Sequence, residues 1–265
     1  MFTMTLDEWA KYRDLLKKLS DKAAEEFRDA VFSESGRWHG IGLANIPRDE
    51  LISFTYALVT KYSEGAATAA CEMYDAIAEL SGVALPPAEP APTASIDEVA
   101  KTVYGTANTN NEEIIANSIG RLVKRAGQDT TLRNAQRDGA YAAWIPSGDT
   151  CAFCITLASR GWELVRNTDF KDGHAKHIHS NCDCAYAVKF NDEVKYSNYD
   201  PSKYEEMYYG APLEKGQRIT AKNRVNALRR EIYAQNKEEI NAQKRSAYEK
   251  RKERESSEAE EADVN

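Results

Sequence analysis

The chain has 265 residues, of which 42% are apolar and 29% charged, and its formal net charge is -7. This length allows one or two domains with an adequate core, while a mean hydropathy of -0.63 indicates much solvated helix surface or disordered ends. No segment has the apolar length of a membrane span, and the net negative charge argues against a protein that coats nucleic acid with its whole surface.

Residues 1–84 are predicted to form an N-terminal helical region. Apolar residues recur at helical spacing over residues 6–19, and a second long helix is predicted to begin at Pro47, as its first residue, and to run towards position 80. A turn-rich connection lies between them, and we expect its Trp38 to pack as a corner of the core rather than to bind a ligand. Cys71, alone among alanines on the second helix, is expected to be a core residue.

A proline-rich linker is predicted at residues 85–94. Four of the nine residues from position 85 to 93 are proline, which excludes a helix or a central strand and favours a semi-rigid linker or a strap across the surface. Sequences that resemble capping boxes begin at Ser95 and at Asn110, so two further helices are predicted to follow. The second helix is expected to place five apolar residues on its inner face: Ile114, Ile115, Ile119, Leu122 and Val123.

Three short strands are predicted in the second half of the chain. They cover residues 139–145, 163–166 and 182–190, and the last alternates with period two. We expect them to form a small antiparallel sheet against helices, which gives an α+β core over residues 95–190. The predicted fold class is therefore α+β and predominantly helical, with long N- and C-terminal helices flanking a small sheet.

Two close cysteine pairs carry the strongest chemical signal in the sequence. Cys151 and Cys154 form the first pair and Cys182 and Cys184 the second. Three of the four histidines of the chain lie between the pairs: His174, His177 and His179. Thiolate and imidazole are ligands that zinc prefers. We therefore predict a structural zinc site with Cys151, Cys154, His179, Cys182 and Cys184 as its candidate ligands.

The sequence leaves the choice among these donors open, because seven cysteines and histidines compete for four positions. Four thiolates close a zinc tetrahedron, and three thiolates with one histidine do the same. Neither set leaves an open position for water. The predicted site is therefore structural, and no catalytic or cofactor-binding residue is assigned.

Local patterns predict that each pair can direct two sulfur atoms to one point. A helix capped by Asp149 would place Cys151 and Cys154 on one face of its first turn, where the helix amides favour thiolates. A strand that begins at Cys182 would place that residue and Cys184 on one face.

Other interpretations of the cysteines remain open. They could pack as small hydrophobic residues, act as a redox pair or form disulfides. Redox activity needs neither the second pair nor the histidines, and residues 1–9 are acidic and lack the apolar segment of a secretory signal. A zinc base deaminase places its histidine before a P-C-x-x-C motif, whereas here the clustered histidines follow the pair and Pro146 is not adjacent to Cys151.

Residues 191–255 are predicted to be a C-terminal helical extension with a short helix at 200–210. From position 213 to 255 the chain carries 13 Lys or Arg against 7 Glu. These basic side chains could contact DNA phosphates, although a solvated charged helix is the simpler interpretation. An apolar stripe predicts docking of this helix: Val225, Leu228 and Ile232. Residues 256–265, with four acids and no base, are predicted to be a disordered acidic tail.

A run of residues around the cysteines has the order seen in a known family. It consists of Thr131-x-x-Asn134-x-x-Arg137, Tyr141-x-x-Trp144, Asp149-x-Cys151-x-x-Cys154, Gly161 and His179-x-x-Cys182-x-Cys184. In this combination the chain resembles the Mu F-like head morphogenesis family, the minor capsid proteins of tailed phages. The likeness extends from the helix before Gly139 to Phe190.

The resemblance implies a minor head protein of the virion that is made in the host cytoplasm and acts in head assembly, inside the capsid or at the portal vertex. Its expected partners are the portal protein, the major capsid protein or both, with packaged DNA as a further partner of the basic C-terminal helix and no membrane. It implies no enzymatic activity. The alternative is a zinc-dependent hydrolase or deaminase-like enzyme acting on nucleic acid or protein, with His174 or His177 as the proton shuttle.

Overall fold

The structure is a computed structural model that describes residues 3–4, 6–107, 111–147, 150–166, 182–196, 199–239, 241–242, 244–246, 248–249 and 252. The chain divides into two compact units. Unit 1 consists of Met1–Asp149 and Arg160–Pro201, and unit 2 consists of Thr150–Ser159 and Ser202–Asn265.

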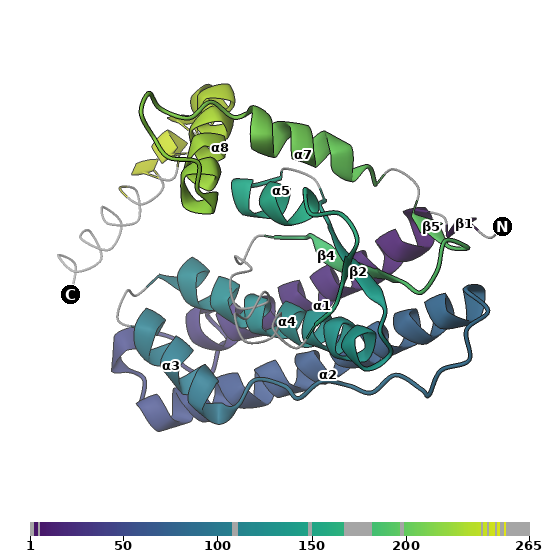
Figure 1. The fold of residues 1–265 in the computed structure, drawn as a ribbon. Coiled ribbons are helices and arrows are strands. Elements are labelled where there is room, and N and C mark those ends of the chain that lie inside the picture. The colour runs from purple at the N-terminus through teal and green to yellow at the C-terminus, as the bar shows by residue number, and fades with distance from the viewer. Residues whose placement is uncertain are drawn as a thin grey trace. The chain divides into compact units, whose positions relative to one another are not determined.

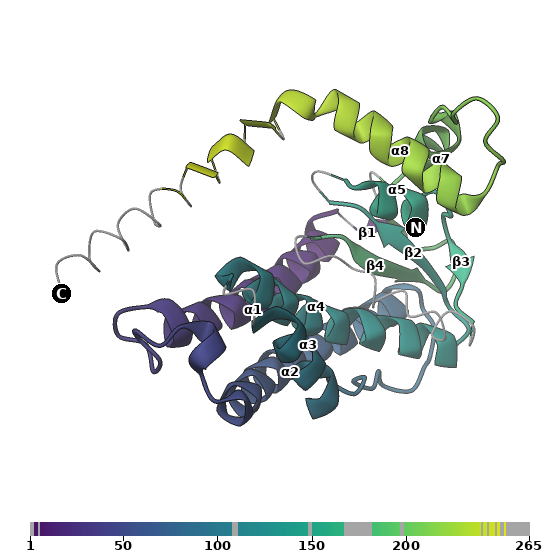
Figure 2. The ribbon, with the colours of Figure 1, turned by 90° about the vertical axis from the view of Figure 1, so that its left-hand side faces the viewer.

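Three long helices form the body of unit 1. They are α1 (Leu6–Phe32), α2 (Arg48–Leu80) and α4 (Glu112–Arg137), and they pack side by side (Figures 1 and 2). The two predicted N-terminal helices are therefore confirmed, although Pro47 stands at the N-cap of α2 rather than inside its first turn. The predicted corner residue Trp38 is buried and meets Phe54 edge to face, with ring centroids 5.2 Å apart.

Two glycines allow α4 to approach its neighbours closely. A Cβ atom at Gly127 would lie 2.7 Å from Leu16 Cδ2 and 3.2 Å from the carbonyl oxygen of Ala66, and one at Gly120 would lie 2.6 Å from Ser20 Oγ. These separations are shorter than van der Waals contact. A larger residue at either position would push α4 away from α1 or α2, because packed interiors leave no room for an extra methyl group.

The capping signals hold in one case and shift in the other. Ser95 caps α3 (Ile96–Thr106) with the complete capping box that its sequence predicts. At α4 the cap is Asn111, which accepts N–H groups of the first turn, while Asn110 lies outside the described residues. Ile114 is 44% exposed, so its predicted place on the inner face is wrong. It lies one residue, about 100° around the helix, from the buried stripe that begins at Ile115.

The proline-rich segment runs extended along α2 and α4, and polar side chains of both helices hold its backbone. Asn134 of α4 accepts the Glu89 N–H at 2.9 Å and donates to the Glu89 carbonyl at 2.8 Å. Arg137, also on α4, donates to two further carbonyls of the segment at 3.0 Å each. These bonds satisfy backbone groups that a sequence rich in proline cannot pair within a helix or a sheet.

A small antiparallel sheet in the order β3-β2-β4 completes the core of unit 1. Its strands are β2 (Tyr141–Ile145), β3 (Glu163–Leu164) and β4 (Ala185–Lys189). The predicted strand from Cys182 therefore begins three residues late, because Ala185 pairs with Ile145, the last residue of β2. A separate parallel pair joins β1 (Thr3–Met4) to β5 (Lys195–Tyr196).

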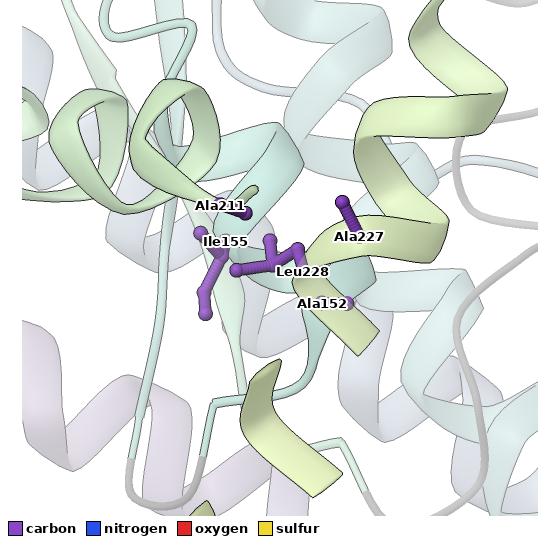
Figure 3. Close-up of a cluster of buried hydrophobic side chains, with 5 residues drawn as sticks. All are labelled: Ala152, Ile155, Ala211, Ala227 and Leu228. Carbon is purple, nitrogen blue, oxygen red and sulfur yellow. The ribbon is translucent and has the colours of Figure 1, made fainter. Parts of the chain in front are cut away.

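Unit 2 has a small apolar core of its own. It contains α5 (Ala152–Ala158), α7 (Pro201–Gly210) and α8 (Ala221–Gln235). Figure 3 shows the five buried side chains that meet in it: Ala152, Ile155, Ala211, Ala227 and Leu228. Val225 and Ile232 pack against this cluster, which confirms the predicted docking stripe of α8. The predicted acidic tail at 256–265 lies outside the described residues.

These elements confirm the predicted α+β class, predominantly helical with a small antiparallel sheet. Among the described helices, none combines the length and the apolar character that a membrane crossing requires.

Candidate metal centre

The first cysteine pair belongs to α5 in unit 2. Cys151 is the N-cap of this helix, and its Sγ accepts the N–H of Cys154 at 3.5 Å. The expectation that both cysteines lie inside the first turn is therefore wrong for Cys151, and the predicted cap, Asp149, lies outside the described residues. Cys154 is buried and stands between Ala152 and Ile155, which belong to the core of unit 2. Packing of α5 into that core fixes the backbone that carries the pair.

The second pair belongs to unit 1 and lies in the three residues that precede β4. Both Cys182 and Cys184 are buried. Cys184 Sγ accepts the backbone N–H of Ser147 at 3.4 Å, from the segment that leaves β2. The backbone before β4 is therefore held by the sheet on one side, because Ala185 pairs with Ile145.

Helix α4 holds the same segment from the other side. Lys124 Nζ donates to the Cys182 carbonyl at 3.0 Å and to Asp183 Oδ1 at 2.9 Å. One turn further along, Gln128 Oε1 accepts the N–H of Tyr186 at 2.9 Å, and its Nε2 donates to the Cys184 carbonyl at 3.5 Å. Both cysteines of the pair are thus flanked by hydrogen bonds from one helix.

Lys124 and Gln128 were not among the predicted site residues. The sequence signal that could have found them is a pair of polar residues at i and i+4 on a helix face whose neighbours, including Val123 and Ala126, are apolar. Polar groups on a buried face need partners, so such a pair indicates a contact with a polar segment elsewhere in the chain.

The structure describes all five cysteines, and it shows no disulfide bond among them, so the alternative of a disulfide framework is not supported. Cys71 lies on α2 and is only half-buried, which departs from the expected core position. Burial, reinforced by the nearby Asp75 carboxylate, raises the pKa of the Cys71 thiol and keeps it protonated at neutral pH. Cys71 is therefore a natural comparison residue for the four clustered cysteines.

The predicted histidine ligand has no structural account. His174, His177 and His179 all lie in the segment 167–181, outside the described residues. His179 as a ligand therefore remains a prediction, as does the choice among the seven donors.

Comparison with known protein families identifies the family to which the chain belongs. The family model described as VG15 protein matches residues 3–211, which includes both cysteine pairs. The chain belongs to the VG15 protein family. This is a family of phage proteins, and membership indicates a protein related to the virion. No curated protein and no solved structure matches the chain significantly.

Proposed function

We propose that this VG15 family protein is a minor structural component of the head of a tailed phage and acts in head assembly near the portal. The observation that carries the proposal is the family match over residues 3–211. The likeness of the cysteine and histidine order to the Mu F-like family supports the more specific assignment to the head and the portal. We propose that the protein itself catalyses no reaction.

A zinc ion bound by the clustered thiols is the second part of the proposal. The ligands that we propose include three thiols, those of Cys154, Cys182 and Cys184, each of which is buried in the structure. The donor set fits zinc because thiolates are soft ligands, and the described cysteines form no disulfide with one another. The bound metal would cross-link the segments that carry the two cysteine pairs. Cys151, or His179 in its place, would be the fourth ligand and would leave no position for a water molecule.

Chain connectivity supports the joint use of both pairs. The amide of Ser147 donates to Cys184 Sγ in unit 1, and Cys151 follows Ser147 by only four residues. Four residues span at most about 14 Å when fully extended. The chain therefore cannot carry the Cys151 backbone far from the second pair, whatever the placement of the two units.

Metal analysis tests the zinc site directly. Protein purified without chelator should contain about one zinc ion per chain, as expected for a closed tetrahedral site. Cys184→Ser should remove the metal and lower the free energy of unfolding by several kcal/mol, since zinc binding in small metal-stabilised folds contributes on the order of 10 kcal/mol. Cys71→Ser should retain the zinc and unfold almost as the wild type does. Metal-free wild-type protein, or equal losses for the two variants, would contradict the zinc site.

Particle composition tests the role in the head. Mass spectrometry of purified particles should detect the protein at a small fraction of the amount of major capsid protein, and co-expression with the portal protein should yield a complex. Absence from particles would contradict the proposal. Zinc-dependent hydrolysis that is lost in a folded His177→Ala variant would instead support the enzyme alternative.

Packaged DNA is a further proposed partner through α8. Lys222, Arg229 and Arg230 are exposed on this helix, and Arg230 also pairs with Glu214 at 3.4 Å. DNA binding by this helix should weaken steeply with salt, and Arg229→Glu with Arg230→Glu should abolish it. Binding that survives this double substitution would show that α8 is not the contact.

A further inference from the structure

Lys124 is an unusual residue for the interior of unit 1. Its side chain is only 7% exposed, although lysines are seldom buried unless they are paired. Burial of an ammonium group costs free energy that its partners must offset. Lys124 contacts two groups of the cysteine segment before β4: the Cys182 carbonyl and the Asp183 carboxylate. The charge is therefore placed, at a cost, beside a proposed metal ligand.

Gln128 extends the same contact by one helical turn. Its amide bridges the carbonyl of Cys184 and the N–H of Tyr186, so it fixes the peptide groups on both sides of Ala185. Glycines at 120 and 127 bring α4 close to α1 and α2, which holds the helix in place. Lys124 and Gln128 are thus anchored on a rigid element, and each fixes the backbone of one cysteine.

The geometry points to Lys124 and Gln128 as positioning residues for the zinc site, an inference that rests on the proposed zinc binding. By holding the carbonyls of Cys182 and Cys184 they restrict the directions in which the two Sγ atoms can point. This is the support that outer hydrogen bonds give to metal ligands. Lys124 adds a fixed positive charge beside a site that, with four thiolates, carries a net charge near -2.

The chain offers a matched control for the charge of Lys124. Lys17 on α1 lies 3.8 Å from the other carboxylate oxygen of Asp183, but its side chain is 47% exposed and donates to Asp21. Lys17→Met therefore removes a second lysine from the same carboxylate without touching the backbone of either cysteine. Lys124 also lines a cavity of about 250 Å³ between α1 and α4, which gives Lys124→Arg room for the larger guanidinium.

Zinc affinity, measured by competition with a chromogenic chelator, tests the inference on the full chain. Lys124→Met and Gln128→Leu should each weaken zinc binding about 10–100-fold, as removal of outer-shell partners does elsewhere. Lys124→Arg should recover most of the loss, and Lys17→Met should bind as the wild type does. Cobalt-substituted Lys124→Met should show an altered thiolate-to-cobalt charge-transfer band. A residue that only stabilised the fold would leave that band unchanged and would lower the melting temperature equally with and without metal.

The outcomes separate the two levels of the proposal. If the wild type binds zinc and both Lys124→Met and Gln128→Leu bind it equally well, the positioning role is overturned while the zinc site stands. If the wild type binds no zinc, both are overturned. Should Lys124→Met fail to fold, as judged by circular dichroism, Gln128→Leu decides alone, because Gln128 is uncharged and its loss leaves no buried charge unpaired.

Discussion

The two units bury very different amounts of apolar structure. Unit 1 encloses large side chains along three long helices, among them Trp9, Phe27, Tyr74 and Ile119. Among the described residues of unit 2, the buried cluster has five members, and three of them are alanines. Small folds with so little core rarely stabilise themselves without a disulfide or a metal. We therefore expect a bound metal to contribute more to the stability of unit 2 than to that of unit 1, which has the larger apolar core.

The largest effect should come from the core of unit 1. Phe27→Ala should lower the free energy of unfolding by about 3–5 kcal/mol, because Phe27 is fully buried and its loss leaves a cavity. Urea denaturation followed by circular dichroism measures the change. Leu15→Ala, on the same helix but 41% exposed, should cost about 0.5 kcal/mol or less. Equal costs for the two would mean that α1 is not packed as the structure shows.

The equivalent change in unit 2 should remain local. Leu228→Ala should lower the free energy of unfolding by about 3 kcal/mol, since Leu228 and Ile155 have the largest side chains of this small cluster. Hydrogen exchange should show faster exchange of α8 amides with unchanged protection of α2 and α4. Tyr233→Ala, at a 42% exposed position of α8, serves as the control and should change neither. Loss of protection throughout unit 1 would show that the two units unfold as one.

Acid should weaken unit 1 through Asp138. Hydrogen bonds from Arg137 at 2.8 Å, and then from Tyr74 at 2.9 Å, lower the pKa of this carboxyl below its usual value. A lowered pKa contributes stability that is complete above the ordinary aspartate pKa and is lost as the pH falls through the folded value. Asp138→Asn should therefore cost about 2 kcal/mol at neutral pH, as expected for hydrogen bonds to a charged group, and progressively less as the pH falls through the folded pKa.

The matched control for this pH dependence is Asp192→Asn. Asp192 also pairs with a basic side chain, that of Lys189, but the Asp192 side chain is 89% exposed, so its ion pair is screened by solvent. Its removal should leave the pH profile of unfolding, measured by urea titration between about pH 2 and pH 7, nearly unchanged. An equally steep acid dependence in wild type and Asp138→Asn would assign the effect to other carboxylates.

The long helices could be predicted from the sequence because a helix repeats its own apolar period. Residues 6–32 and 48–80 carry that period without reference to any other segment. The capping box at Ser95 is equally local, and so it was predicted correctly. The start of β4 is not local: it depends on where β2 ends, and only the pairing of Ile145 with Ala185 fixes it.

The candidate metal centre shows the same limit. The cysteine pairs are visible as spacings, but the residues that hold one pair in place come from a helix 58 residues away. Lys124 and Gln128 look like surface residues until the cysteine segment is placed against them. The cap of α5 was also assigned wrongly, because a cysteine is an uncommon N-cap and Asp149 offered a commoner one.

Loss of a helix N-cap should have the smallest effect on stability. It gives the most direct comparison of the two units, because the same kind of cap can be removed in each. Ser95 Oγ accepts the N–H of Glu98 at the start of α3 in unit 1, and Thr220 Oγ1 accepts the N–H of Asn223 at the start of α8 in unit 2. Replacing either by alanine removes one cap and should cost about 1 kcal/mol. Glycine at the same position should cost only a few tenths, which separates loss of the cap from other damage.

The two cap variants should differ in which part of the chain loses stability. In unit 1, α3 packs on α2 and α4, so Ser95→Ala should lower the melting temperature of the whole unit slightly. In unit 2 the same cost falls on a helix with few buried side chains, so Thr220→Ala should raise the exchange rate of α8 amides about fivefold, which corresponds to 1 kcal/mol, while α2 and α4 exchange as before. If Thr220→Ala instead raises the amide exchange rates of both units equally, the two cores do not unfold independently. A bound metal would then stabilise the whole chain rather than unit 2 alone.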